Sequence, residues 1–143
     1  MRIIEPVSPG DYQKYYDLRW TILRAPWDQP RGSERDTRDA NSTHLMMVDD
    51  RDIAVAVGRL HFNSIREAQV RYMAVATGQQ RRGFGSRLLN ALEEKATSLG
   101  AASIVLDARE TALDFYRKQG YSADGPGHVL YNCITHVKMR KTL

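Results

Sequence analysis

The amino-acid sequence predicts a single mixed α/β domain that spans residues 1–143. Strand-like runs alternate with segments of helical spacing in the order β-α-ββ-β-α-β-α-ββ, which is typical of one mixed α/β unit. A chain of this length can bury one core, and its composition, 42% hydrophobic and 27% charged, is ordinary for a soluble globular domain. No repeat, linker or low-complexity segment divides it.

The first elements are a short strand at residues 2–7 and a helix. The segment Ser8-Pro9-Gly10-Asp11 has the pattern of a helix start, with the serine as N-cap and the proline at the first helical position. We expect this helix to end near Arg24, because Pro26 pushes the residue before it out of the α region. Residues 26–43 form the longest polar stretch. A loop of this length in a compact domain is functional, disordered or contains a short helix.

The middle of the chain is predicted to form strands. Residues 44–48 and 53–62 flank an aspartate-rich turn and have the pattern of a hairpin. Residues 68–76 form the next strand, which leads directly to the turn Q-Q-R-R-G-F-G-S-R at positions 79–87.

The remaining elements alternate between helix and strand. Apolar positions keep helical spacing from Phe84 to Leu99, and the glycine that follows is a natural helix stop. Residues 101–108 predict a buried strand, and a capping pattern at Thr111 opens a helix that ends at Gly120. The last residues, with Gly125-Pro126-Gly127 as the turn signal, predict a hairpin.

Composition excludes several classes of function. The net charge is +4, from 21 basic and 17 acidic residues, and the basic residues are scattered, which argues against a nucleic-acid surface but suits small anionic ligands. Cys133 is the only cysteine, so no intrachain disulfide forms and a reducing compartment is expected. With no signal-like or membrane-spanning apolar run, we expect a cytoplasmic protein. Four dispersed histidines have no zinc-site spacing, so no metal is predicted.

The turn at residues 79–87 has the features of an anion site. It joins the end of a strand to the start of a helix, where free N–H groups and the helix dipole favour negative charge. Glycines let a diphosphate approach the backbone, and the arginines add charge. The sequence contains no G-x-x-x-x-G-K-[ST] motif, and Leu88 stands where a dinucleotide G-x-G-x-x-G motif requires glycine.

Two blocks in this chain resemble the GNAT superfamily of N-acetyltransferases. The first is Q-x-x-G-x-G at Gln80, Gly83 and Gly85, directly after a strand that ends M-A-V. The second is L-D-A-R at 106–109 followed by A-L-D-F-Y-R-K-Q-G-Y at 112–121. Together they cover about 55 residues. The resemblance implies a GNAT fold: one domain with a mixed, mostly antiparallel sheet of six or seven strands flanked by helices.

The resemblance also implies a site for acetyl-CoA as acyl donor. Backbone amides of the turn would hold the diphosphate, the last residues of the preceding strand would pair with the pantetheine arm where two strands splay apart, and Tyr116 would protonate the departing thiolate. The implied cofactor-binding residues are Met73, Ala74, Val75, Gln80, Arg81, Arg82, Gly83, Phe84, Gly85, Ser86, Arg87 and Tyr116.

The general base is the point where this sequence departs from the family. A primary amine with a pKa of about 10.4 must lose a proton before it attacks, and a base contributes roughly 10²–10⁴ in rate. Gln69 stands where the histone-acetylating branch has a glutamate, and an amide is not a base. Glu67, on the same strand face, is the predicted catalytic base. His44 and His61 on neighbouring strands, or a water relay, are alternatives.

The predicted function is therefore transfer of acetyl from acetyl-CoA to a primary amine by direct attack in a ternary complex. The resemblance also makes Trp27, Glu34 and His128 candidate contacts of the acceptor, which the sequence does not identify. Gln69 at the base position favours an alternative, a module that binds acyl-CoA with little or no turnover. Because GNAT domains often pair, a homodimer is a further expectation.

Overall fold

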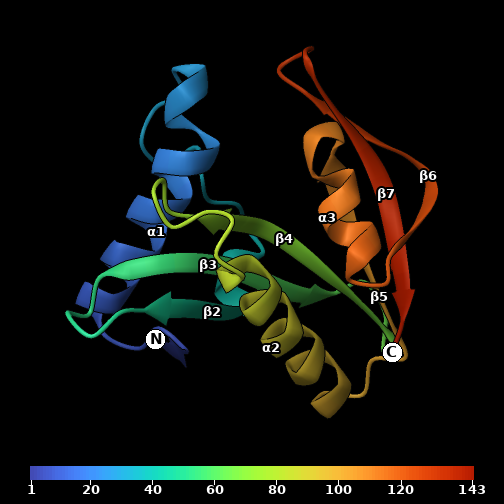
Figure 1. Cartoon of the computed structure of the whole chain (residues 1–143), viewed down its shortest axis with the longest axis horizontal. Coiled ribbons are helices and arrows are strands. Elements are labelled where there is room, and N and C mark those ends of the chain that lie inside the picture. The colour runs from blue at the N-terminus through green and yellow to red at the C-terminus, as the bar shows by residue number, and fades with distance from the viewer.

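Seven strands form one sheet in the computed structural model, which describes residues 1–143 (Figure 1). In chain order they are β1 (Arg2–Ile4), β2 (Thr43–Val48), β3 (Ala54–Phe62), β4 (Glu67–Val75), β5 (Ser103–Arg109), β6 (Ser122–Leu130) and β7 (Ile134–Thr142). Their order across the sheet is β1-β2-β3-β4-β5-β7-β6, and only β4 and β5 run parallel. The mixed, mostly antiparallel sheet predicted from the sequence is confirmed.

Three α-helices flank the sheet: α1 (Pro9–Leu23), α2 (Phe84–Ser98) and α3 (Leu113–Lys118). The start of α1 is the predicted one, since the Ser8 hydroxyl accepts from the Asp11 amide at 3.0 Å and the Asp11 carboxylate accepts from the Ser8 amide at 3.3 Å. This reciprocal pair satisfies two N–H groups that a helix end otherwise leaves free. No helix is both long enough and apolar enough to cross a membrane.

The two long helices cover opposite faces of the sheet (Figure 1). One face buries the α2 side chains Leu88, Leu89 and Leu92 against β2, β3 and β4. The other face buries Tyr15 of α1 against a smaller cluster that includes Met46. The helix α3 packs on the same side as α2, because its aromatic residues join the larger cluster.

Strands β4 and β5 separate partway along their length, and this opening positions the site. They pair only through residues 67–69 and 103–105, although β4 continues to Val75 and β5 to Arg109. The edge of β4 that faces β5 therefore lacks a strand partner over its last residues. We call this opening between the diverging strands the splay.

A bulge distorts β4 beside the splay. Tyr72 has a left-handed backbone, with φ of 55°, and the register with β3 shifts between Val57 and Arg59. Such bulges re-aim side chains and bend the strand. The hydroxyl of Tyr15 donates to the carbonyl of Gly58, opposite the bulge, at 3.1 Å, which supplies a partner for a buried polar group.

Several boundaries differ from the sequence-based expectation. The first strand ends at Ile4 rather than residue 7, because the Val7 amide donates to the Asp11 carboxylate and the chain has left the sheet. Thr111 does not cap a helix; residues 110–112 form a 3₁₀ turn, η3, before α3. The turn of the final hairpin lies at residues 131–133.

The position of that final turn has a backbone explanation. Tyr131 and Asn132 both have positive φ, as a tight turn between two strands requires. The segment Gly125-Pro126-Gly127 instead lies inside β6, where the register with β7 shifts on both sides of the proline. Proline cannot donate to the ladder, so it interrupts the pairing without reversing the chain.

Candidate functional site

The turn between β4 and α2 presents a row of free backbone donors. No backbone amide from Gln80 to Ser86 donates a hydrogen bond within the chain. The first hydrogen bond of the helix runs from the Arg87 backbone amide to the Gly83 carbonyl at 3.1 Å. Gly83 is the N-cap, with φ of 81°, and no side chain caps the helix. The first turn also contains no acidic residue. This arrangement favours an anion at the start of α2.

The glycines of the turn have different roles. A Cβ on Gly83 would meet no atom within 4 Å, so this position needs glycine for its left-handed backbone and leaves open space on its outer side. A Cβ on Gly85 would contact Phe115 and Val75 at 3.5–3.6 Å. Gly85 therefore lets α2 start close to both α3 and the end of β4.

Side chains fix the turn to the elements around it. The side-chain amide of Gln80 donates to the Val75 carbonyl at 3.2 Å, which holds the turn against the end of β4. The Gln119 amide donates to the Ser86 hydroxyl at 2.9 Å, which links the end of α3 to the start of α2. The free amides are therefore held in place before any ligand arrives.

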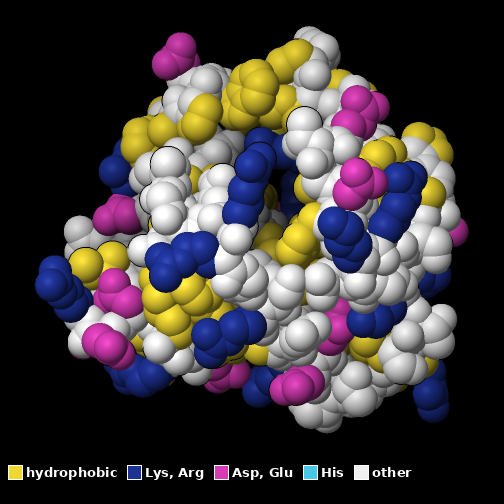
Figure 2. Space-filling view, in the orientation of Figure 1, with side chains coloured by type: hydrophobic (Ala, Val, Ile, Leu, Met, Phe, Trp, Pro, Cys, Tyr) yellow, Lys and Arg dark blue, Asp and Glu magenta, His cyan; other side chains and the backbone are white.

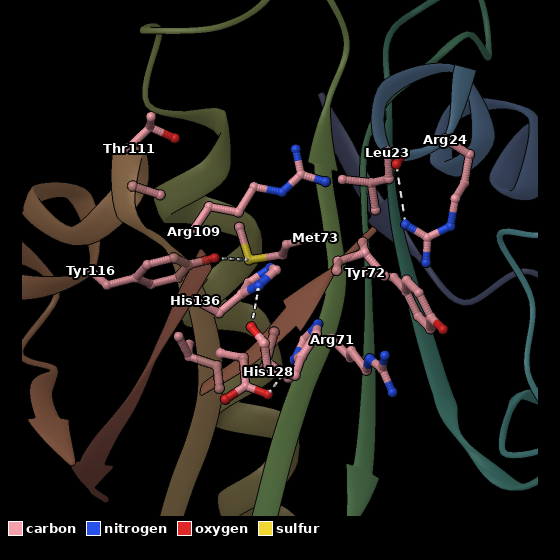
Figure 3. A pocket seen from close by; sticks show the side chains of 15 residues that line it. Leu23, Arg24, Arg71, Tyr72, Met73, Arg109, Thr111, Tyr116, His128 and His136 are labelled. Atoms are coloured by element: carbon pink, nitrogen blue, oxygen red, sulfur yellow. Dashed lines mark hydrogen bonds and ion pairs between the residues drawn. The ribbon is translucent and has the colours of Figure 1, made fainter. Parts of the chain in front are cut away.

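A cavity of about 180 Å³ lies in the splay (Figure 3). Its walls come from the end of α1, from β4, β5, β6 and β7, and from α3. Side chains that define it include Leu23, Arg24, Arg71, Tyr72, Met73, Asp107, Arg109, Tyr116, His128 and His136. The splay thus connects this cavity with the edge of β4 that leads to the free amides.

Tyr116 extends from α3 into this cavity. Its hydroxyl lies 4.0 Å from the Met73 sulfur, and the two are drawn facing each other in Figure 3. Burial raises the pKa of Tyr116 to about 12, although the positive charge of Arg109 opposes the shift. The phenol is therefore protonated at neutral pH and acts as a hydrogen-bond donor. Phe115 packs on the neighbouring side, with ring centroids 5.0 Å apart.

Two stacked histidines also line the cavity. The rings of His128 and His136 lie 4.1 Å apart at an interplanar angle of 20°. The Nδ1 of His128 donates to the Asp107 carboxylate at 3.0 Å, and the Nδ1 of His136 donates to the His128 carbonyl at 3.0 Å. Each imidazole therefore keeps its Nε2 free to accept a proton. Burial, and then the nearby His128, lower the pKa of His136 and favour its neutral form.

A buried charged cluster supports the β4 bulge from behind. The guanidinium groups of Arg19 and Arg59, both fully buried, lie 4.4 and 4.8 Å from the centroid of the Tyr72 ring. Asp39 pairs with both, at 2.9 and 3.1 Å. Burial alone would raise the pKa of Asp36, but its hydrogen bond and ion pair with Arg59 lower it to about 2. The acids of the long polar loop are therefore structural partners of buried arginines.

The predicted base, Glu67, does not line the cavity. Its carboxylate pairs with Arg140 at 2.9 Å and accepts from the Asn63 amide at 3.1 Å. The hydrogen bond from Asn63, followed by the Arg140 contact, lowers the pKa of Glu67. Gln69 also accepts from Asn63, at 2.9 Å. The structure thus does not bring Glu67 to Tyr116, and its catalytic role stays a prediction.

The alternative bases on neighbouring strands are buried outside the cavity. His44 lies between the Tyr15 hydroxyl and the Asp39 carbonyl, 2.8 Å from each. His61 contacts Arg59, and burial together with that charge lowers its pKa to about 4. Neither imidazole faces the cavity.

Of the three candidate acceptor contacts, only His128 lines the cavity. Glu34 is buried and accepts from the Gly32 amide at 3.0 Å, and Trp27 is exposed elsewhere on the loop. Sequence reasoning missed Asp107, Arg109 and His136 as site residues, because strand pairing brings them together. The L-D-A-R block did contain two of the three, so its match to a family motif was the available signal.

Comparisons with known proteins agree with this geometry. A family model described as the acetyltransferase (GNAT) family matches residues 12–121. The uncharacterized N-acetyltransferase YjcF of Bacillus subtilis is 28% identical over 112 residues, which are 78% of this chain and 79% of that protein.

Solved structures show the same fold. A putative N-acetyltransferase from Lactobacillus plantarum has a TM-score of 0.87 at 24% identity, covering 99% of this chain and 97% of that one. An aminoglycoside 6'-N-acetyltransferase complexed with coenzyme A has a TM-score of 0.80 at 20% identity, with the same coverage of both chains.

Proposed function

The chain belongs to the acetyltransferase (GNAT) family, and from this premise we propose that it transfers an acetyl group from acetyl-CoA to a primary amine. One observation carries the proposal. The free amides of residues 80–86, the unpaired edge of β4 and the cavity with Tyr116 follow one another along the splay. An acyl donor with a phosphate end, an extended arm and a reactive thioester fits these three features in that spatial order.

Each part of acetyl-CoA has candidate partners in this chain. The amides from Gln80 to Ser86 hold the diphosphate, and Arg81, Arg82 and Arg87 add positive charge around it. The backbone of Met73 to Val75 pairs with the pantetheine arm as an additional strand would. The thioester then lies in the cavity, beside Tyr116.

The reaction is direct attack of the amine nitrogen on the thioester carbonyl carbon. A C–N bond forms, the C–S bond breaks, and the thiolate leaves as coenzyme A. The protonated phenol of Tyr116 donates a hydrogen bond to the leaving sulfur, and amides of β4 polarise the carbonyl.

The amine must also lose its protons, and the cavity supplies a base in the Asp107–His128 pair. The carboxylate of Asp107 accepts from Nδ1 of His128, which leaves Nε2 to accept the proton of the attacking amine. The earlier prediction of Glu67 requires that residue to act through water, because its carboxylate does not line the cavity.

Calorimetric titration with acetyl-CoA tests the donor site, using the wild type, Gly83→Asp and Gly100→Asp. The two glycines are a matched pair at opposite ends of α2, since both have positive φ and neither has an atom within 4 Å of an added Cβ. Both substitutions therefore place a side chain on a left-handed backbone in open space, but only Gly83→Asp adds a negative charge at the proposed diphosphate site.

We expect micromolar binding by the wild type and by Gly100→Asp, and at least tenfold weaker binding by Gly83→Asp because of charge repulsion at the turn. Equal binding by all three proteins would remove the turn from the donor site. No binding by any of them, with all three folded by circular dichroism, would remove acetyl-CoA as the donor.

A further inference from the structure

The cavity carries more positive charge than the proposed acetyl transfer requires. Three arginines line it, Arg24, Arg71 and Arg109, against a single carboxylate, Asp107. That carboxylate is already bonded to His128. In Figure 2 dark blue Lys and Arg side chains gather around the central hollow of the molecule. The three arginines therefore find no unbonded carboxylate among the residues that line the cavity.

Arg109 is the least satisfied of these groups. It is half-buried on β5, and its guanidinium has no carboxylate within 4.0 Å and no hydrogen bond within the chain. Burial, and then the positive charge of Arg24, lower the pKa of Arg109. Keeping a partly desolvated cation near a second cation is costly unless an anion arrives to pair with it.

Arg24 also has no carboxylate partner, although it is better satisfied than Arg109. Its guanidinium donates only to backbone carbonyls, to Ser33 at 3.0 Å and to Leu23 at 3.1 Å. Arg71, by contrast, lies 3.7 Å from the Asp36 carboxylate. Two of the three cavity arginines thus lack a negative partner, and both lie where β5 and the end of α1 approach the cavity.

We propose that the acceptor is a small amine that also carries a carboxylate, which Arg109 and Arg24 bind while the amine faces His128 and Tyr116. This inference rests on the proposed acetyl transfer. The planar fork of a guanidinium matches a carboxylate with two parallel hydrogen bonds. The cavity of about 180 Å³ suits a small amino acid.

The same charges exclude another class of acceptor. A polycationic amine, such as an aminoglycoside or a polyamine, needs carboxylates around its additional ammonium groups. This lining supplies none beyond Asp107, and its arginines repel such a substrate. The fold likeness to an aminoglycoside acetyltransferase is therefore no reason to expect an aminoglycoside as the acceptor of this chain.

The test compares acceptors in pairs that differ only in the carboxylate. Pairs such as β-alanine with propylamine and 4-aminobutanoate with butylamine have similar amine pKa values, and spermidine represents the polycations. Acetylated product is measured by mass spectrometry for the wild type, Arg109→Gln and Arg117→Gln. Arg117 is the matched control, because it lies on α3 next to Tyr116 but is exposed and outside the cavity.

We expect wild-type kcat/KM to favour each carboxylate acceptor by about tenfold to a hundredfold, the range for hydrogen bonds to charged groups. Arg109→Gln should raise KM for the carboxylate acceptors by a similar factor and leave KM for the alkylamines unchanged. Arg117→Gln should resemble the wild type with both kinds of acceptor. Equal use of both members of each pair, or a preference for spermidine, would overturn the inference. So would a rise in KM in Arg109→Gln that is the same for both members, since that would show that Arg109 does not recognise the carboxylate.

A binding measurement separates this inference from the proposed transfer. Calorimetry with the protein saturated with coenzyme A measures binding of 4-aminobutanoate and of butylamine without any turnover. Tighter binding of the amino acid that Arg109→Gln abolishes supports the carboxylate site even if no amine is acetylated, in which case only the transfer proposal fails. Equal or absent binding of both probes overturns the carboxylate site.

Discussion

The buried imidazole of His61 makes the stability of the protein depend on pH. His61 is 7% exposed and lies 3.3 Å from an Nη of Arg59. Because arginine only donates, Nδ1 of His61 is the acceptor and a proton there would face the guanidinium. Burial first, and then the charges of Arg59 and Arg38, lower the pKa of His61 from 6.5 to about 4.

The sign of the effect follows from that shift. Above pH 6.5 His61 is neutral in both the folded and the unfolded chain, so it contributes no pH dependence. Between pH 6.5 and about 4 the unfolded chain binds a proton that the folded chain rejects, and stability falls as the pH falls. At pH 5 the loss in free energy of unfolding is about 2 kcal/mol, or a melting temperature lower by roughly 4–8 °C for a chain of this size.

The assay is urea unfolding followed by circular dichroism at pH 8, 6.5 and 5, for the wild type and His61→Asn. Asparagine keeps an acceptor for Arg59 but does not titrate. His44 and His136, whose pKa values are also lowered, titrate in both proteins, so the difference between the two isolates His61. The variant should lose about 2 kcal/mol less than wild type between pH 8 and pH 5. Equal losses would mean that His61 titrates normally and that its contact with the guanidinium is misassigned.

Four further substitutions test the site and the packing beneath it. Tyr116→Phe should leave the Kd for acetyl-CoA unchanged and lower kcat at least tenfold by removing the donor to the leaving sulfur; unchanged turnover in steady-state kinetics would remove this role. His128→Gln should lower kcat by roughly 10²–10⁴, whereas Asp107→Asn should lower kcat less; unchanged turnover in His128→Gln would assign the role of base to another group. Gly58→Ala should cost about 1–3 kcal/mol in urea unfolding, because its Cβ would lie 2.8 Å from a methyl of buried Leu92; wild-type stability would show that this packing yields.

Local sequence patterns were sufficient to predict the elements that are stabilised by interactions between residues close together in the chain. The capping box at Ser8 and Asp11 involves residues three positions apart, and the structure contains both of its hydrogen bonds. The strand, turn and helix around Gly83 form one continuous segment, so their order was readable directly. The boundaries failed where local patterns competed: Gly125-Pro126-Gly127 resembles a turn, yet Tyr131 and Asn132 adopt the left-handed backbone and reverse the chain.

The residues that line the cavity could not be predicted from local sequence signals. Asp107 and His128 are 21 positions apart and meet only because β7 lies between β5 and β6 in the sheet. Whether Arg109 has a carboxylate partner likewise depends on which side chains the fold places around it. In the long polar loop the charges nearly balance, and only the structure shows that Asp36 and Asp39 neutralise buried arginines.

The central claim is that this chain moves an acetyl group from acetyl-CoA to an amine. The most direct measurement is mass spectrometry of a reaction that contains the wild-type protein, acetyl-CoA and the panel of carboxylate-bearing and simple amines. The account predicts an acetylated amine and coenzyme A in equal amounts, with the yield lost in Gly83→Asp. Binding of acetyl-CoA without any acetylated amine would contradict the claim and favour the acyl-CoA-binding module that Gln69 suggested.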